Sequence, residues 1–224
     1  MKYDCSDSLA GKRTFLAIAC SGLLLSAGDS TATVLNFDEI SGSLYGTLYA
    51  DDTYLNQGVR ISSGSTPQAP LLLNDVFTLG DPRTDFYVYS NTEAVSGFNT
   101  VGATGQGGGN PNDILLTFTT PVSFVSLRTD HSVEQADIVQ LVGLVPTGNP
   151  LEFRVTAVFS AADNALAAPF DTLSLSSGAG FTYVLFQQTT DLEAFDDLTY
   201  IPIPEPGVGG LLLVGGLAVW RRRR

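Results

Sequence analysis

Between residues 33 and 200 the chain is divided into short runs rich in β-branched and aromatic residues, separated by Gly, Pro, Asn and Asp. Runs of this kind are typical of strands, and no stretch of helical length shows the period of an amphipathic helix. Alternation along Leu151, Phe153, Val155 and Ala157 predicts a strand with one buried and one exposed face. The predicted strands are Thr33–Asp38, Gly58–Ser62, Asp85–Tyr89, Ile114–Thr119, Val122–Thr129, Ile138–Val145, Leu151–Phe159, Thr172–Leu175, Phe181–Gln187 and Leu198–Ile201.

Turn residues predict how some of these strands are joined. Thr119-Thr120-Pro121 and Pro146–Pro150 each separate two strong strands, so we expect a hairpin at both places. The glycine-rich segment Gly102–Asn112 lacks the strand, helix and lysine of a phosphate-binding loop, and we predict a mobile loop. The fold class expected is all-β, a single antiparallel β-sandwich that is jelly-roll-like. It would be flanked by an N-terminal signal peptide (1–32) and a C-terminal sorting tail with a hydrophobic helix (201–224).

The charge of the chain is unevenly distributed. The 224 residues carry 11 Lys+Arg and 23 Asp+Glu, a formal net charge of −12. Residues 33–200 contain four arginines, no lysine and 19 acidic residues, which gives −15. Such a surface repels phosphate backbones, so nucleic-acid binding is excluded.

The N-terminus has the three parts of a secretory signal peptide. Lys12-Arg13 is the basic region and Phe15–Leu25 the apolar run, while small residues place a cleavage site before Thr33 or after Gly28. Both cysteines, Cys5 and Cys20, lie in the segment that cleavage would remove. We therefore expect an exported protein that folds without disulfides.

The C-terminus combines three elements in order. Alternating prolines between residues 201 and 206 favour an extended spacer, which precedes the apolar stretch 207–220 and four arginines. Fourteen residues in a helix span roughly 21 Å, less than the ~30 Å hydrocarbon core, although Trp220 and the arginines can reach the interface. The arginines stay on the cytoplasmic side, so the body lies outside the membrane.

This arrangement resembles the PEP-CTERM sorting signal of bacteria with a Gram-negative envelope. The resemblance implies recognition by exosortase, a membrane-embedded cysteine transpeptidase, with the inner membrane as a transient location. It also implies that Glu205 is a recognition residue for that enzyme. The residues that match the signal are Pro202, Pro204, Glu205, Pro206, Arg221, Arg222, Arg223 and Arg224.

A second resemblance concerns the body. Asn36–Glu39, Gln57–Ile61 and Phe195–Leu198 are similar to the strand edges of jelly-roll domains in PEP-CTERM proteins and carbohydrate-binding modules. The resemblance implies that the first and last strands lie close and can share a structural Ca²⁺ ion. Paired carboxylates suit such a hard cation. The candidate ligands are Asp38, Glu39, Asp196 and Asp197; the alternative is that these are solvated acids at strand ends.

Aromatic residues offer a candidate surface for sugars. Tyr45, Tyr49 and Tyr54 fall in one polar stretch, and Tyr87 and Tyr89 are expected on one face of the same strand. Exposed rings can stack on sugars; the alternative, which is favoured for any single tyrosine, is that it belongs to the core or rim of a sandwich.

Enzymatic activity has little support in the sequence. His131 is the only histidine, and no serine lies in a Gly-x-Ser-x-Gly motif, so we predict no catalytic residues. We expect an exported surface or extracellular-matrix protein with a structural or adhesive role in exopolysaccharide or biofilm. The alternatives are a calcium-stabilised carbohydrate-binding module and, third, a glycan-degrading hydrolase that uses two carboxylates.

Overall fold

The computed structural model describes residues 30–43, 46–67, 69–90, 99–103, 113–130, 138–162, 170–188 and 195–204. Ser30–Ile203 form one compact unit. The described part is all-β, as predicted, with one 3-10 turn, η1 (Leu55–Gln57). Its strands are β1 (Thr33–Leu35), β2 (Thr47–Ala50), β3 (Val59–Ser65), β4 (Val76–Thr78), β5 (Gly80–Arg83), β6 (Asp85–Ser90), β7 (Asn99–Gly102), β8 (Asp113–Asp130), β9 (Ile138–Pro146), β10 (Glu152–Ala162), β11 (Phe170–Gln188) and β12 (Phe195–Pro202).

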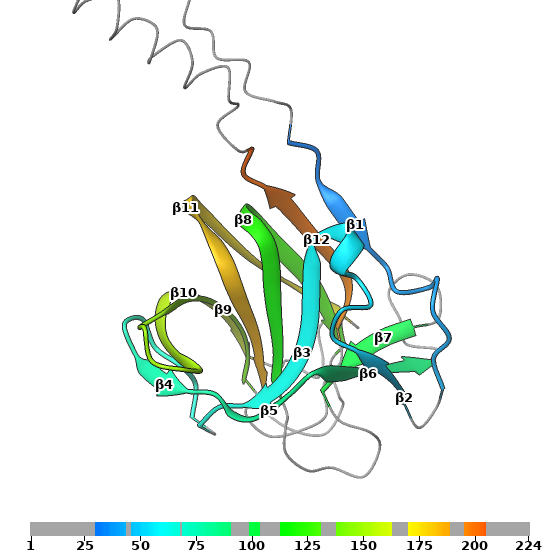
Figure 1. Ribbon diagram of the computed structural model, residues 1–224, viewed down its shortest axis with the longest axis horizontal. Coiled ribbons are helices and arrows are strands. Elements are labelled where there is room, and N and C mark those ends of the chain that lie inside the picture. The colour runs from blue at the N-terminus through cyan, green and yellow to red at the C-terminus, as the bar shows by residue number, and fades with distance from the viewer. Residues whose placement is uncertain are drawn as a thin grey trace, which may run out of the picture. The chain divides into compact units, whose positions relative to one another are not determined.

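The strands form one antiparallel sheet. Hydrogen-bonded neighbours follow the order β2-β6-β7-β12-β8-β11-β9-β10-β4, while β1 pairs with β12, and β3 pairs with both β8 and β5. The two longest strands, β8 and β11, lie side by side in the middle of the fold (Figure 1). β1 and β12 pair through Thr33 and Tyr200, so the first and last strands are adjacent, as the second resemblance implied.

The long strands β8 and β11 divide this sheet into two half-sheets. The start of β8 pairs with β3, its end pairs with β12, and only the end of β11 pairs with β9. We call β3, the start of β8, the end of β11, β9 and β10 the first half-sheet. The end of β8, the start of β11, β12, β7, β6 and β2 make the second.

The main core contains side chains from both half-sheets. Leu116 and Phe186 of the first half-sheet belong to the same buried cluster as Leu127 and Phe195 of the second. Edge-to-face contacts join Phe186 to Phe195, with ring centroids 5.4 Å apart. This packing of one half-sheet on the other gives the sandwich-like architecture.

The predicted hairpin at Thr119-Thr120-Pro121 is wrong, because β8 runs through these residues without a turn. Pro121 lies where β8 exchanges β3 for β12 as its neighbour, so its missing N–H breaks no regular ladder. Its carbonyl accepts a hydrogen bond from the Ile203 amide at 2.8 Å. The pairing of β8 with β11 shifts register on either side of Phe181. The predicted strands Thr172–Leu175 and Phe181–Gln187 are likewise parts of β11.

The first half-sheet is buried on both faces. A second core, on the face away from the main core, contains Leu115, Val142, Leu144 and Leu185, all at most 7% exposed. Side chains from the segment Leu71–Leu79 belong to this core. Burial on both faces explains why the run Ile138–Val145 is almost continuously apolar.

Two buried glutamines fasten this covering segment to the sheet. Gln140 Oε1 accepts a hydrogen bond from the Leu71 amide at 2.7 Å, and Gln140 Nε2 donates to the Leu71 carbonyl at 3.2 Å. Gln187 Nε2 donates to Thr66 Oγ1 and to the carbonyls of Pro67 and Ala69, at 2.7 to 3.1 Å. Buried polar groups are stabilising only when their hydrogen bonds are made, as they are here.

Other strand predictions met mixed outcomes. The turn at Pro146–Pro150 does join β9 to β10. The alternation expected along β10 is interrupted between Val155 and Ala157, where the register shifts. Phe153 and Val155 therefore belong to the second core, whereas Ala157 packs against the main core and Leu151 is 44% exposed. The short strands β2, β4, β5 and β7 were not predicted.

Candidate functional site

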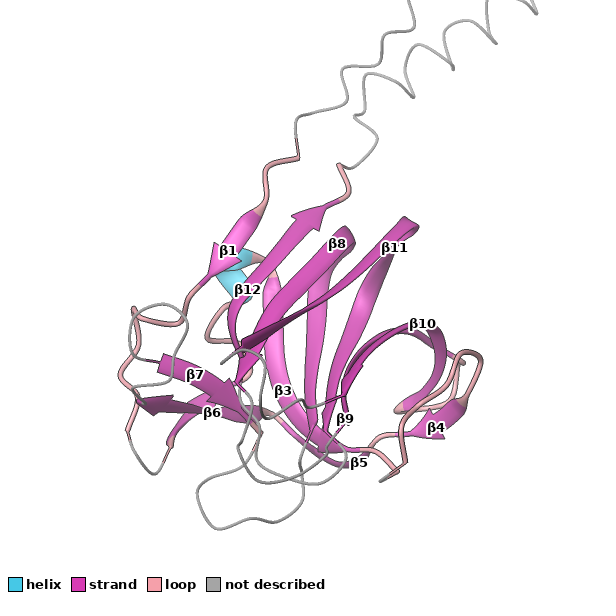
Figure 2. Cartoon of the chain, turned by 180° about the vertical axis from the view of Figure 1, so that it is seen from behind, coloured by secondary structure: helices cyan, strands magenta, loops and turns pink. Residues whose placement is uncertain are grey.

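Tyr87 and Tyr89 lie on the same face of β6, as their spacing predicted. The intervening residues, Phe86 and Val88, are fully buried in the main core, so the tyrosines face away from it. Both tyrosines are partly exposed. Their rings are nearly parallel, with centroids 6.5 Å apart and an interplanar angle of 26°. We call this side of β2, β6 and β7 the tyrosine face; β6 and β7 are labelled in Figure 2.

Glycines border the Tyr89 ring. A Cβ atom added to Gly102 of β7 would lie 2.6 Å from Tyr89 Cε2, and one added to Gly46 would lie 2.9 Å from Cε1. Neither position has room for a side chain while the ring keeps its place. Leu48 of β2, which is opposite Tyr87, is 52% exposed and adds apolar surface to the tyrosine face.

Polar atoms without a hydrogen-bond partner accompany the rings. The Tyr89 hydroxyl, Thr100 Oγ1 and Asp85 Oδ1 are buried atoms of this kind. Thr100 is opposite Tyr89 on β7 and only 1% exposed, while Asp85 is two residues before Tyr87 and shares its face. Leaving a buried polar atom unpaired costs about 1 to 3 kcal/mol, so such atoms are worth explaining.

The Tyr89 hydroxyl is protonated at neutral pH. Burial raises its pKa to about 12, and the nearby Tyr87 adds to the shift. A neutral hydroxyl can both donate and accept a hydrogen bond, as Thr100 Oγ1 can, whereas the Asp85 carboxylate only accepts. Two aromatic rings beside such groups provide the contacts that a sugar ring with its hydroxyls requires.

The four acids predicted to bind calcium are not assembled into a site. Within the described ranges, no three His, Cys, Asp or Glu side chains form a group that could hold a metal ion. Asp38 and Glu39 are exposed. Asp196 is 1% exposed, and its Oδ1 accepts a hydrogen bond from the Asp197 amide at 2.7 Å. Calcium binding stays a prediction, which melting with and without a chelator would test.

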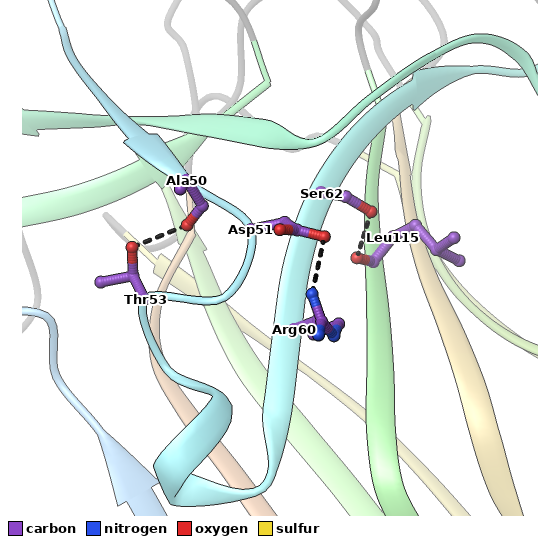
Figure 3. A network of polar contacts seen from close by, with 6 residues as sticks. All are labelled: Ala50, Asp51, Thr53, Arg60, Ser62 and Leu115. Atoms are coloured by element: carbon purple, nitrogen blue, oxygen red, sulfur yellow. Dashed lines mark hydrogen bonds and ion pairs between the residues drawn. The ribbon is translucent and has the colours of Figure 1, made fainter.

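Arginines neutralise several of the acids. Arg128 Nη1 lies 3.9 Å from Asp197 Oδ2, and Arg60 Nη1 lies 3.3 Å from Asp51 Oδ2 (Figure 3). The Arg128 pair accounts for one of the predicted calcium ligands, because β8 brings its side chain beside β12. Glu39 acts differently: burial raises the pKa of Tyr54 well above its usual range, and the charge of Glu39 raises it further.

The sorting-signal residues lie mostly outside the described part of the chain. Pro202 ends β12 and Pro204 is exposed. Glu205, Pro206 and the four terminal arginines are not described, nor are His131, Tyr45 and residues 104–112 of the predicted loop. In the part that is described, no helix is long and apolar enough to cross a bilayer.

Sequence reasoning found the tyrosines but missed their surroundings. Thr100 and Gly102 belong to β7, a strand too short to stand out as a periodic run. Asp85 is the first residue of the predicted strand Asp85–Tyr89, and nothing in the sequence marks it as part of a site. The sequence held one usable signal, since the glycines at 46 and 102 are compatible with a large side chain on a neighbouring strand.

Comparisons with known proteins give little more. No family model matches the chain, and no curated protein matches it. Among solved structures, the K2 cleaved adhesin domain of Lys-gingipain (Kgp) is similar over 75% of this chain and 97% of that domain, with 14% sequence identity and a TM-score of 0.39. A likeness at this level carries no conclusion about this chain.

Proposed function

We propose that this chain is an exported, non-catalytic surface or extracellular-matrix protein that adheres to extracellular polysaccharide. The observation that carries the adhesive role is the tyrosine face, where two nearly parallel rings lie beside the unpaired polar atoms of Tyr89, Thr100 and Asp85. The ligand class is a neutral glycan, because a body of net charge −15 opposes polyanionic chains.

The location is supported by the two ends of the sequence. A signal peptide ending near residue 32 would export the body, and the tail from Pro202 to Arg224 matches the PEP-CTERM signal. In this proposal an exosortase-type transpeptidase cuts the tail after the C-terminal helix has held the protein in the inner membrane. The body is then released to the cell surface or the matrix.

A glycan array of neutral and acidic glycans, probed with the mature protein, tests the adhesive role. Neutral glycans should bind the wild type and lose about tenfold or more in affinity with the Tyr87→Ala/Tyr89→Ala double variant, since aromatic stacking is worth on the order of 1 kcal/mol per ring. Leu72→Ala is the control: its side chain is 66% exposed but lies in the segment Leu71–Leu79, away from the tyrosine face. Absence of any glycan hit would contradict the adhesive role.

Prolonged incubation of a bound glycan separates binding from cleavage. The proposal predicts that its chain length is unchanged, whereas shortened products would favour the hydrolase alternative. Intact mass of the protein recovered from the cell surface tests the sorting step. We expect a product without Trp220 and the terminal arginines, and a product that retains them would contradict processing.

A further inference from the structure

The open edges of the sheet differ in how well they are protected against pairing with another strand. An unpaired edge presents backbone N–H and C=O groups that can add a further strand, and proteins usually protect it with short length, charge or proline. β4 has three residues, and β2 has four and is followed by Asp51 and Asp52. β5 contains Asp81, Pro82 and Arg83.

The second part of β10 has none of these protections. β4 pairs with β10 only at Glu152, Phe153 and Arg154, and the Asn74 and Asp75 backbones extend this pairing to Val155. From Thr156 to Ala162 β10 pairs with β9 on one side, and no described strand pairs with its other side. These seven residues include no charged residue and no proline.

Side chains at this edge also favour a partner. Phe159 is 39% exposed and is the only aromatic among the large hydrophobic residues that are exposed in the described ranges. On the face of β10 toward the second core, Val158 packs against that core, and Ser160 Oγ accepts a hydrogen bond from Gln140 Nε2 at 2.7 Å. The strand is therefore held rigidly in place, so a partner would pair with a preformed edge.

The start of β11 is the nearest rival, because it pairs only with β8. Between Thr172 and Ser176 its apolar residues, Leu173 and Leu175, are already buried in the main core, at 0% and 7% exposed. The other side chains between Thr172 and Ser176 are the hydroxyl-bearing Thr172, Ser174 and Ser176. Along Thr172–Ser176 a partner would cover no large exposed apolar side chain, whereas at β10 it would cover Phe159.

We propose that the Thr156–Ala162 edge of β10 pairs antiparallel with the same edge of a second copy of this chain. The body carries −15, so two copies repel each other over most of their surfaces. Thr156–Ala162 carries no charge, and the two nearest charges in sequence, the exposed Arg154 before it and Asp163 directly after it, are opposite in sign, so acidic repulsion is weakest here. A two-fold axis pairs identical segments, and the register that places Phe159 opposite Phe159 covers both exposed rings.

Single-cysteine cross-linking of the full chain in its host tests this pairing. Cys5→Ser and Cys20→Ser leave an introduced thiol as the only one in the chain. Phe159→Cys should give a dimer on a non-reducing gel, because directly opposite residues of an antiparallel pair bring their Cβ atoms within disulfide reach. Ser176→Cys, on the exposed edge of β11, is the matched control and should stay monomeric. No Phe159→Cys dimer, or equal dimers from both variants, would overturn the proposal.

Charge substitution gives a second test that does not depend on oxidation. Phe159→Lys and Phe159→Glu place like charges opposite each other, so each variant alone should dimerise at least about tenfold more weakly than wild type in analytical ultracentrifugation. An equimolar mixture should regain the dimer, which a misfolded variant would not do. Wild type that is monomeric at every soluble concentration would contradict the inference while leaving glycan binding by the tyrosine face untouched.

Discussion

Strand β11 passes through two different environments. Near its end, Leu185 faces away from the main core and is fully buried in the second core. Near its start, Ser174 faces the same way but remains partly exposed to solvent. One strand therefore belongs to a half-sheet that is covered on both faces and to another that is covered on one.

The two half-sheets therefore differ in role: the first stabilises the fold, and the second carries the candidate binding surface. The first half-sheet, closed by the segment Leu71–Leu79 and by the two buried glutamines, packs against both cores. The second half-sheet leaves one face open, and the tyrosine face is its β2-β6-β7 part. A ligand site on strands that pack on a rigid partner keeps its geometry better than one on loops.

The largest effect is expected in the doubly covered half-sheet. Leu185→Ala should lower the free energy of unfolding by about 2 to 5 kcal/mol, because it opens a cavity in the second core. Ser174→Ala, on the same strand, should change it by less than about 0.5 kcal/mol. Urea unfolding of both variants measures the contrast, and equal losses would mean that the two half-sheets are covered alike.

Removing the hydrogen bonds that Gln187 makes to the covering segment should lower the free energy of unfolding by less than Leu185→Ala does. Gln187→Leu removes hydrogen bonds to Thr66, Pro67 and Ala69 and the bond from the Leu71 amide, and we expect a loss of about 1 to 3 kcal/mol in unfolding free energy. Hydrogen exchange should show faster exchange in the segment Leu71–Leu79. Wild-type exchange rates there would contradict a fastening role for Gln187.

On the tyrosine face we expect a substitution that raises the free energy of unfolding instead of lowering it. Thr100→Val replaces a buried hydroxyl that has no hydrogen-bond partner, so we expect a gain of about 1 kcal/mol in unfolding free energy. The same variant should bind its glycan more weakly, since it loses a group that could bond a sugar hydroxyl. Thr199→Val, on β12, serves as the control for binding. A destabilised Thr100→Val protein would show that the hydroxyl has a structural partner.

The smallest effect belongs to the ion pair on β8 and β12. Arg128 and Asp197 side chains are 42% and 23% exposed, so their coupling energy should be at most about 1 kcal/mol. A double-mutant cycle with Arg128→Gln and Asp197→Asn at low and high salt measures it. A larger, salt-independent coupling would indicate that the pair acts as a buried structural element.

Sequence patterns predicted the strands that bury a regular face and failed where the sheet is irregular. Phe153 and Val155 alternate as expected, but the register shift before Ala157 depends on pairing with β9, which no local pattern records. Pro121 is a turn signal in most contexts. Here it lies inside β8 because two different neighbours meet at that point, and this is a property of the whole sheet.

In the candidate site, too, local spacing predicted some positions, whereas others depend on how the strands pair. Spacing alone placed Tyr87 and Tyr89 on one face, because side chains alternate along any strand. Thr100 joins them only through the β6–β7 register. Arg128 was counted as one of few cations, yet its position beside Asp197 follows from the pairing of β8 with β12, 69 residues apart in sequence at this pair.

Calorimetric titration of the mature protein with the neutral glycan that binds best on the array tests the central claim most directly. The account predicts saturable binding by the wild type and by Leu72→Ala, and at least about tenfold weaker binding by the Tyr87→Ala/Tyr89→Ala variant, all measured well below each protein's melting temperature. Equal affinities for all three proteins would contradict the claim that the tyrosine face is the adhesive surface.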